Sequence, residues 1–240
     1  MASDFVYGRI PVLECLKAQK RIARRLILLE GGKKQNEFIS AAQDIPIEWV
    51  TRKELDYMTH DGVHQGIVLE ADPIPLLNLD SWLEEAQNPQ SLILVLDSVE
   101  DPHNFGAIAR SAAACGVSAM IFANDRSAPV SPVSMKSAAG AMEYVDLIQV
   151  TNLPRALDNL KKKNYWVAGL DPDGEKILCD ADFTGKTALV IGNEGKGMRP
   201  LVKKKCDYLV HIPISGPISS LNASVSAAIA LMECVRQQHL

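Results

Sequence analysis

The sequence predicts an α/β protein with two domains, the larger of which is built on a parallel sheet. At 240 residues, the chain is long enough for two modest hydrophobic cores. Short apolar runs alternate with stretches of helical periodicity, which is the pattern of successive β-α-β units. Hydrophobic residues make up 47% of the chain and charged residues 22%, which is the composition of a folded globular protein.

The first 72 residues predict a small α/β domain. A helix opens at Pro11, because proline is favoured in the first helical turn. Strands are expected at 26–29, 47–50 and 66–69, and further helices at 37–43 and 53–58. Prolines at positions 73, 75 and 89 then flank a short amphipathic stretch, so residues 73–90 are expected to form a semi-rigid linker.

Residues 91–240 predict the parallel sheet. The run 92–96 is apolar at every position, as expected for a strand that helices cover on both faces. Further strands are expected at 119–122, 147–150, 166–170, 188–191 and 209–212, separated mostly by helical patterns. The last helix begins near Asn222 and is rich in small residues, which predicts a closely packed partner.

Composition argues against several classes of protein. The net charge of −4 does not suit a chain that coats nucleic acid through bulk electrostatics, although a local basic patch is compatible with it. No apolar run approaches the roughly 20 residues of a membrane span, and the first residues lack a signal-peptide pattern. We therefore expect no membrane partner and a place in the cytoplasm, or in an organelle matrix if the source is eukaryotic. The cysteines are scattered and no ligand cluster has metal-site spacing, so no metal is expected.

Ligands of open parallel sheets bind where the strands end, so the loops after the strands are the candidate sites. The first such loop, 97–106, leads into a helix that carries Arg110. Asn104 offers an amide and Arg110 a permanent cation, both suited to a ribose or a phosphate. The alternative is that Asn104 caps the helix and Arg110 is a solvated charge.

The second loop, 192–198, directly follows the strand 188–191. Gly192 and Gly197 let the backbone approach a ligand, and Glu194 places a carboxylate in the turn. The glycine spacing fits neither a nucleoside-triphosphate loop nor a dinucleotide fingerprint. A purely structural turn is the alternative.

The third loop, 212–222, runs into the last helix. Ser219, Ser220 and Asn222 gather hydroxyls and an amide at the helix start, where they either cap the helix or bind a polar ligand. A serine hydrolase is disfavoured, because no G-x-S-x-G elbow is present.

Basic residues are concentrated in the first domain. Residues 17–34 hold one acid, Glu30, and seven basic residues: Lys17, Lys20, Arg21, Arg24, Arg25, Lys33 and Lys34. Such a cluster neutralises phosphates of a nucleic acid, and the alternative is an ordinary solvated helix face. His64 and Gln65 either contact RNA or turn the chain into the next strand.

The three loops, in this order and at this spacing, resemble the three motifs of the SpoU family of RNA ribose 2′-O-methyltransferases. The resembling segments are 97–110, 189–198 and 212–228. Segments 63–67 and 136–143 also resemble the branch that methylates a guanosine ribose in large-subunit ribosomal RNA. The resemblance spans nearly the whole chain.

The resemblance implies a catalytic domain tied in a deep trefoil knot, the SPOUT fold, behind a ribosomal-protein-like RNA-binding domain. It also implies a homodimer with the active site at the subunit interface, ribosomal RNA as the partner and S-adenosylmethionine as the methyl donor, without a metal. The donor is expected on main-chain groups at Gly192, Asn193, Gly197, Ile212 and Leu221. The implied catalytic set is Asn104, Arg110, Glu194, Ser220 and Asn222, and the expected RNA-binding set is Lys17, Arg21, Arg24, Arg25, His64 and Gln65.

Arg110 resembles the family's catalytic arginine, but an arginine side chain is a poor base because its pKa exceeds about 12. It can favour an alkoxide electrostatically or hold an RNA phosphate that accepts the proton, and we prefer the phosphate. Three rival functions stay open: the same chemistry on transfer RNA, a non-catalytic RNA-binding protein of ribosome assembly, and a nucleotide-binding module on 192–197. The last lacks every other expected motif.

Overall fold

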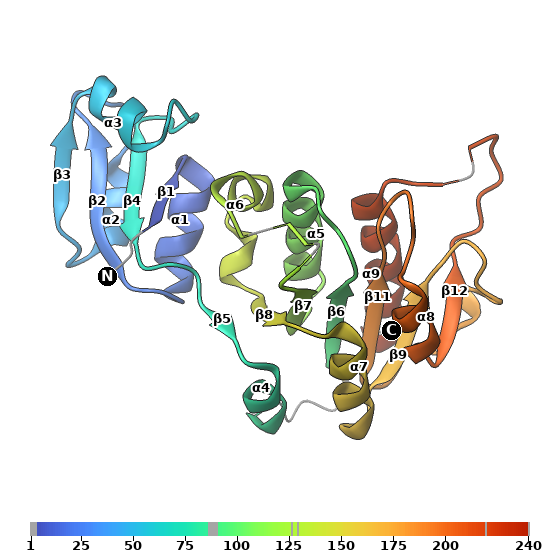
Figure 1. The fold of residues 1–240 in the computed structure, drawn as a ribbon. Helices are drawn as coiled ribbons and strands as arrows, with labels where there is room; N and C mark the ends of the chain where they lie inside the picture. Colours follow the sequence, from blue (N-terminus) through green and yellow to red (C-terminus); the bar gives the residue numbers. More distant parts are fainter. Residues whose placement is uncertain (1–3, 86–90, 126, 129, 219, 240) are drawn as a thin grey trace.

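The computed structural model describes residues 4–85, 91–125, 127–128, 130–218 and 220–239. Over these residues the strands form a four-stranded sheet in the order β1-β4-β2-β3 and an eight-stranded sheet in the order β10-β12-β9-β11-β6-β7-β8-β5 (Figure 1). Every described strand pair of the larger sheet is parallel, so the predicted parallel α/β architecture is confirmed.

The small sheet forms the first domain. Its elements are β1 (Asp4–Tyr7), α1 (Arg9–Ala18), β2 (Ala23–Leu29), α2 (Asn36–Ala42), β3 (Ile47–Val50), α3 (Arg52–Met58) and β4 (Ile67–Ala71). The strand β4 runs antiparallel to β1 and β2, and β3 runs parallel to β2. The sequence analysis does not predict β1, in which only Val6 is fully buried.

The helix α3 is fixed at both its start and its inner face. Thr51 precedes it, and the Glu54 carboxylate accepts hydrogen bonds from the Thr51 N–H and hydroxyl, both at 2.8 Å. This capping box satisfies backbone groups that would otherwise lack partners. Leu55 is completely buried and packs with Ile27 and Val68 beneath the helix. The outer face of α3 is therefore presented on a rigid support.

The larger sheet alternates with helices along the chain. Its elements are β5 (Leu76–Leu77), α4 (Leu79–Glu85), β6 (Leu92–Leu96), α5 (Pro102–Ala114), β7 (Ala119–Ala123), α6 (Pro132–Ala138), η1 (Ala141–Glu143), β8 (Asp146–Val150), α7 (Leu153–Lys162), β9 (Trp166–Leu170), β10 (Lys176–Ile177), η2 (Leu178–Asp180), β11 (Thr187–Ile191), α8 (Pro200–Lys205), β12 (Tyr208–His211) and α9 (Ala223–His239).

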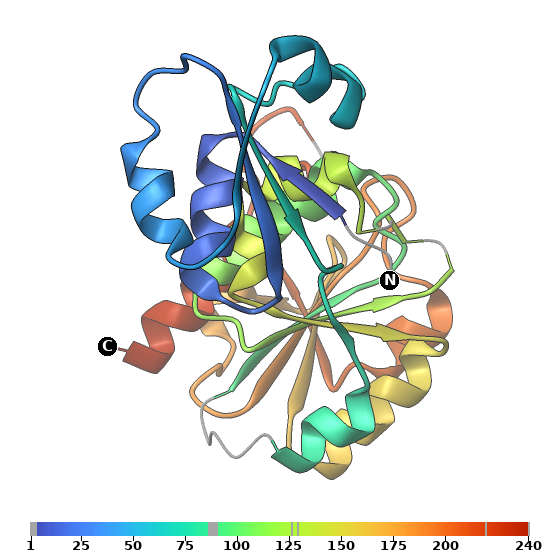
Figure 2. The same ribbon diagram turned by 90° about the vertical axis from the view of Figure 1, so that its left-hand side faces the viewer.

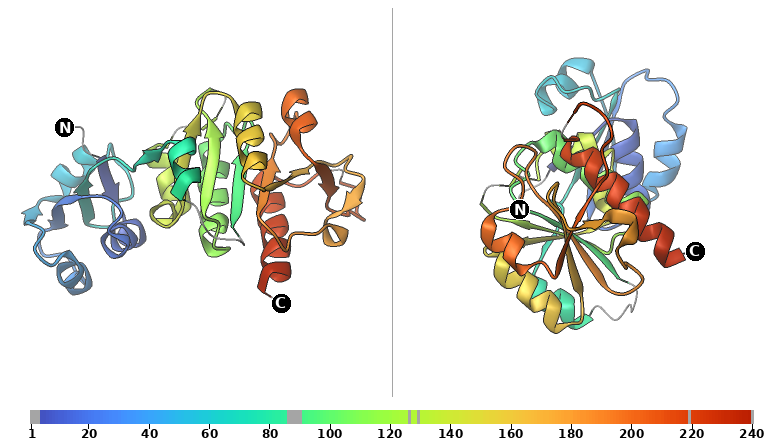
Figure 3. Two further views of the ribbon diagram at one scale, coloured as in Figure 1. Left: turned by 90° about the horizontal axis from the view of Figure 1, so that it is seen from below. Right: turned by 90° about the vertical axis from the view of Figure 1, so that its right-hand side faces the viewer.

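Helices cover both faces of this sheet, as the apolar strand sequences predict (Figure 3). On one face, Phe105 and Ile108 of α5 share a core with Ala227 and Leu231 of α9. On the other face, side chains of α4, α7 and α8 form the second core. The interior is thus a three-layer arrangement whose strands all end at one edge.

The segment expected to be a linker is largely built into the larger domain. The strand β5 pairs with β8, and α4 buries Leu79 and Leu83 in the sheet's core. These leucines are four residues apart, so they lie on one face of the helix. Residues 86–90 of the expected linker lie outside the described residues.

The two domains meet where α1 lies against η1 and β1 lies against α6 (Figure 2), and Met135 of α6 packs against the core of the first domain. Arg21 and Glu143 form an ion pair at 2.5 Å, and their side chains are only 3% and 4% exposed. Lys20 Nζ lies 3.3 Å from an Asp146 oxygen, and the Tyr144 hydroxyl donates to Glu14 at 2.6 Å. The orientation of the first domain is therefore set by a partly buried interface that combines these polar contacts with apolar packing.

Within the described residues, no helix is long and apolar enough to cross a membrane. The same residues contain no cluster of three or more His, Cys, Asp or Glu side chains able to hold a metal ion.

Candidate active site

The first two candidate loops meet because β6 and β11 are neighbours in the sheet. Asp97, directly after β6, is completely buried, and its carboxylate accepts hydrogen bonds from the Arg199 backbone N–H at 2.7 Å and side-chain Nε at 2.6 Å. Arg199 directly follows the second loop. Sequence alone does not indicate this pair, although an acid directly after a buried strand is a usable signal for Asp97.

Asn193 holds the second loop in shape. Its side-chain amide donates to the Ser98 carbonyl at 2.9 Å, and its side-chain oxygen accepts from the N–H groups of Gly195 and Lys196. Asn193 and Gly197 also exchange backbone hydrogen bonds at 3.1 and 2.9 Å. Asn193 thus uses its side chain and its backbone N–H to shape the loop, and its backbone carbonyl oxygen keeps one further lone pair for a ligand.

Two glycines of this loop are required by the backbone path. A Cβ atom on Gly192 would lie 2.5 Å from both the Gly197 carbonyl carbon and the Met198 nitrogen, so no larger residue fits there. Gly197 has a φ of 64°, in the left-handed region that glycine adopts without strain. The loop therefore closes tightly and presents its backbone beside the end of β11.

A chain of hydrogen bonds connects all three candidate loops. The Asn104 amide donates to Glu194, and the Asn222 amide donates to the Asn104 side-chain oxygen at 3.0 Å. The Asn222 side-chain oxygen accepts from the backbone and hydroxyl of Ser224 at 2.9 and 2.6 Å. The structure thus brings together Asn104, Glu194 and Asn222, three of the predicted catalytic residues, from segments that lie far apart in sequence.

Arg110 does not take part in this series of hydrogen bonds. It lies six residues after Asn104 on α5, which is about 120° around the helix axis at 100° per residue. Its side chain is exposed, and no ion pair or hydrogen bond to it is found within the described part of the chain. Arg110 is therefore a free cation on another face of the helix that carries Asn104, available to an anionic substrate.

The third loop has unused main-chain groups and exposed apolar side chains. Over the described residues of 212–221, no backbone-to-backbone hydrogen bond is formed. Ile214, Ile218 and Leu221 are 41%, 69% and 38% exposed. Ser220 is exposed, and Ser219 lies outside the described residues.

These features fit S-adenosylmethionine. Its adenine ring needs an apolar surface, while its purine nitrogens, ribose and amino-acid group need hydrogen-bond partners. The expected donor residues Ile212 and Leu221 lie at the two ends of this third loop, and Gly192 lies at the end of the strand that precedes the second loop. The main chain of the two loops can supply the polar contacts.

The basic cluster of the first domain is more neutral than its sequence window predicts. Acids from outside the window pair with it: Lys17 with Glu14, Arg24 with Asp72, and Arg25 with both Glu48 and Glu70. The expectation that Arg21 contacts RNA needs correction, because Arg21 is 8% exposed and paired with Glu143 between the domains. A single-sequence window cannot reveal acids that the fold brings from other strands.

His64 and Gln65 both take part in the turn before β4. His64 is 5% exposed, its Nε2 lies 2.9 Å from Asp56 Oδ1, and its Nδ1 accepts from the Gly66 N–H. Gln65 has a φ of 54°, and its side-chain oxygen accepts from the Arg9 N–H at 2.9 Å. These contacts favour the turn-forming alternative for His64. Gln65 is exposed, and among the described residues its side-chain amide nitrogen has no partner.

Known proteins similar to this chain are RNA methyltransferases. Residues 91–232 match the model of the SpoU rRNA Methylase family, and residues 5–77 match that of RNA 2′-O ribose methyltransferase substrate binding. The chain is 39% identical over 242 residues to the 23S rRNA (guanosine-2′-O-)-methyltransferase RlmB of Pseudomonas putida, covering 98% of this chain and 97% of the relative. The protein of the same name from Pasteurella multocida is 46% identical over 198 residues, covering 81% of this chain and 80% of that one.

Solved structures extend the comparison to the cofactor. The SpoU methyltransferase AviRb from Streptomyces viridochromogenes, in complex with the cofactor AdoMet, superimposes with a TM-score of 0.83 at 26% identity, covering 98% of this chain and 90% of that one. The SpoU family implies a deep trefoil knot, and its methyltransferases use S-adenosylmethionine. The SpoU rRNA Methylase model matches residues 91–232, and the relatives align over nearly the whole chain. The chain therefore belongs to the SpoU rRNA methylase family of RNA methyltransferases.

Proposed function

We propose that this protein transfers the methyl group of S-adenosylmethionine to the ribose 2′-hydroxyl of a guanosine in large-subunit ribosomal RNA. The observation that carries the proposal is the set of hydrogen bonds that joins Asn104, Glu194 and Asn222, with Arg110 on the same helix as Asn104. The near full-length relatives named as 23S rRNA guanosine methyltransferases support the substrate. The bacterial origin of these relatives supports action in the cytoplasm.

The donor supplies an activated methyl group, and the protein's task is to hold it and the ribose in line. A displacement of this kind needs the attacking oxygen about 3 Å from the methyl carbon, opposite the departing sulfur. Backbone groups at Gly192, Ile212 and Leu221 hold the donor. The carbonyl oxygens of Asn193 and Gly197, which each keep a second lone pair, accept further hydrogen bonds from it. Ser220 is exposed in the third loop and has no hydrogen-bond partner among the described residues, so its hydroxyl can hydrogen-bond close to the transferred group.

The asparagines are oriented to bind the ribose. Each side-chain amide has two N–H donors. Asn104 uses one on Glu194 and Asn222 uses one on Asn104, so each keeps a second N–H for a ribose oxygen. Glu194 acts by fixing which way the Asn104 amide points, because a carboxylate accepts hydrogen bonds only.

Arg110 deals with the charge of the reaction. The ribose hydroxyl must lose a proton, and arginine stays protonated at any physiological pH. Its planar guanidinium binds an RNA phosphate through two parallel hydrogen bonds, and that phosphate takes the proton. The exposure of Arg110 and the absence of a partner within the described residues support this role.

The site is completed in a homodimer that packs through α9. Val225, Ile229 and Met232 are 47%, 39% and 58% exposed, and their spacing of four and three residues places them on one helix face. The Met232 sulfur lies 3.7 Å from the Cys115 sulfur at the end of α5, the helix that carries Arg110. A partner packed on this face buries the stripe and brings its surface close to α5.

The first domain binds the RNA substrate, and residues from 91 onward form the catalytic domain. Lys17, Arg24 and Arg25 remain at least partly exposed, so they reach phosphates at the edge of the domain. Gln65 contributes its free amide. The substrate-binding match over 5–77 supports this division of labour.

The test is tritium transfer from labelled S-adenosylmethionine into unmodified large-subunit ribosomal RNA and into transfer RNA, with nuclease mapping of the labelled ribose. We expect label in one guanosine of ribosomal RNA, lost in Arg110→Ala. Arg110→Lys is expected to bind the donor normally and lose most activity, because a point charge replaces the bidentate fork. Label in transfer RNA alone redirects the substrate, and donor binding without label in either RNA, free or in ribosomal particles, contradicts the proposal in favour of a binding protein.

A further inference from the structure

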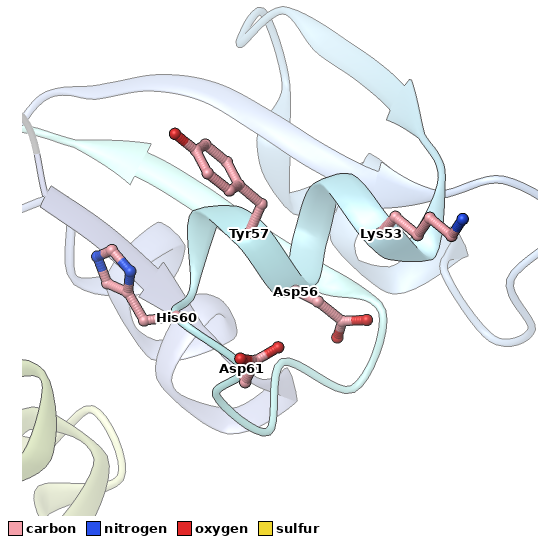
Figure 4. Close-up of a pocket in the computed structure, with 5 residues that line it drawn as sticks. All are labelled: Lys53, Asp56, Tyr57, His60 and Asp61. Atoms are coloured by element: carbon pink, nitrogen blue, oxygen red, sulfur yellow. The ribbon is translucent and has the colours of Figure 1, made fainter.

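A shallow depression lies on the outer face of α3, away from the catalytic loops. It has a volume of about 410 Å³ and is lined by Lys53, Asp56, Tyr57, His60 and Asp61 (Figure 4). Lys53, Asp56 and Tyr57 are three and four residues apart, so they share one face of the helix. His60 and Asp61 come from the turn that follows it. None of these residues belongs to the basic cluster expected from sequence to bind RNA.

Tyr57 gives the depression an aromatic surface. Its side chain is 84% exposed, more than that of any other large apolar residue in the described chain. The ring does not contribute to the domain's core, which α3 reaches through the completely buried Leu55. Because the Thr51–Glu54 capping box fixes the helix, the ring stands on a rigid base. An exposed flat ring on a rigid support is what unpaired nucleic-acid bases stack on.

The charged side chains that line the depression favour a base over a phosphate. The Asp61 carboxylate is exposed and forms no ion pair within the described residues, and Asp56 also lines the depression. Carboxylates repel phosphates but accept hydrogen bonds from the amino groups of bases. Lys53 supplies one cation at the rim, where it can meet the adjoining phosphate.

We propose that an unpaired base of the substrate RNA, carrying an exocyclic amino group, stacks on Tyr57 and donates to Asp61. This recognition site rests on the proposed function, since it serves the same RNA. In Figures 1 and 2 the connection from α3 to β4 lies on the same side of the molecule as the loops that follow β6, β11 and β12. One RNA can therefore reach both the depression at Tyr57 and the catalytic loops.

The first test compares aromatic substitutions in the full-length protein. Filter binding of a labelled, unmethylated large-subunit ribosomal RNA transcript gives the Kd, and tritium transfer at saturating RNA gives kcat. Tyr57→Ala should raise the Kd about 5- to 150-fold, the loss of one base stack, with kcat and donor affinity unchanged. Tyr57→Phe keeps the ring and should bind within about twofold of the wild type. The matched control is Trp49→Ala, which removes another exposed aromatic of this domain, 47% exposed on β3, and should leave the Kd unchanged.

The second test uses the sign of a charge change. If Asp61 accepts a base amino group, Asp61→Asn should weaken RNA binding, because a charge-assisted hydrogen bond is lost. If Asp61 merely repels the backbone, the same substitution should tighten binding, and the base-recognition proposal is overturned. A Tyr57→Ala protein with the wild-type Kd also overturns it while leaving the methyltransferase proposal intact. A wild-type protein that neither binds nor methylates the transcript overturns both.

Discussion

The buried pair between Arg21 and Glu143 should hold the first domain in place. Changing Arg21 to Met removes the cation and leaves a carboxylate that is only 4% exposed without its partner. Breaking a buried pair in this way costs about 3–5 kcal/mol. Arg21 also donates to the Asp72 carbonyl at 3.1 Å, so the substitution removes a second contact.

Differential scanning calorimetry measures this loss of unfolding free energy as a lower transition temperature, Tm. A domain of 60–100 residues loses about 4–8 °C in Tm for each kcal/mol, so 3 kcal/mol lowers the transition of the first domain by roughly 12–24 °C. Two variants that each keep a single tryptophan, Trp49 in the first domain or Trp166 in the second, allow fluorescence to follow the unfolding of each domain separately. The two transitions should then separate in Arg21→Met, because the domains no longer stabilise each other.

A control and a double substitution decide whether the pair itself is responsible. Arg24→Met removes an arginine whose side chain is 36% exposed and should cost no more than about 1 kcal/mol. Arg21→Met combined with Glu143→Leu should recover most of the stability, because no buried charge is left alone. Within the described residues, Arg21 Nε and Glu143 Oε2 already lack hydrogen-bond partners, which favours this recovery. A double variant as unstable as the sum of the two single changes would refute the reasoning.

Three further outcomes follow from the structure. Asn222→Ala removes the donor to Asn104 and should lower methyl transfer about 5- to 150-fold with an unchanged circular dichroism spectrum; activity within twofold of the wild type contradicts the role of the network. Ile229→Asp places a charge in the α9 stripe and should convert a dimer to monomers in light scattering, whereas a dimer that persists rules out this face. Burial raises the pKa of Cys206 and of Cys234 from 9.0 to about 12. The folded state thus holds these protons more tightly, and the resulting stability is complete below pH 9 and lost between pH 9 and 12; a urea midpoint that rises over this range would disprove it.

The sequence predicts the larger sheet better than its edges. The run 92–96 identifies β6 as a buried parallel strand because each of its positions is apolar. The strand β1 escapes prediction because it is four residues long and buries only Val6 fully. The elements β5 and α4 escape because nearby prolines resemble a connector, and only the fold shows that Leu79 and Leu83 pack into the core.

The site was predictable in its parts and less so in its connections. The three loops follow from strand ends and from the family resemblance, which also supplies the knot that periodicity cannot reveal. The pairing of Asp97 with Arg199, 102 residues apart, depends on β6 lying beside β11, and a single sequence does not give strand order. The partners of Arg25 were missed for the same reason, since Glu48 and Glu70 arrive on neighbouring strands.

The way the first domain is attached has a consequence for the RNAs that the protein can bind. Because Arg21 and Glu143 pair between the first domain and η1, they help to set the separation and angle between the outer face of α3 and the catalytic loops. An RNA that touches both must present its docking nucleotide and its target ribose at that same separation. With the base site proposed on α3, folded RNAs of another spacing would satisfy one contact and miss the other. The domain interface would then help to decide which nucleotide is methylated.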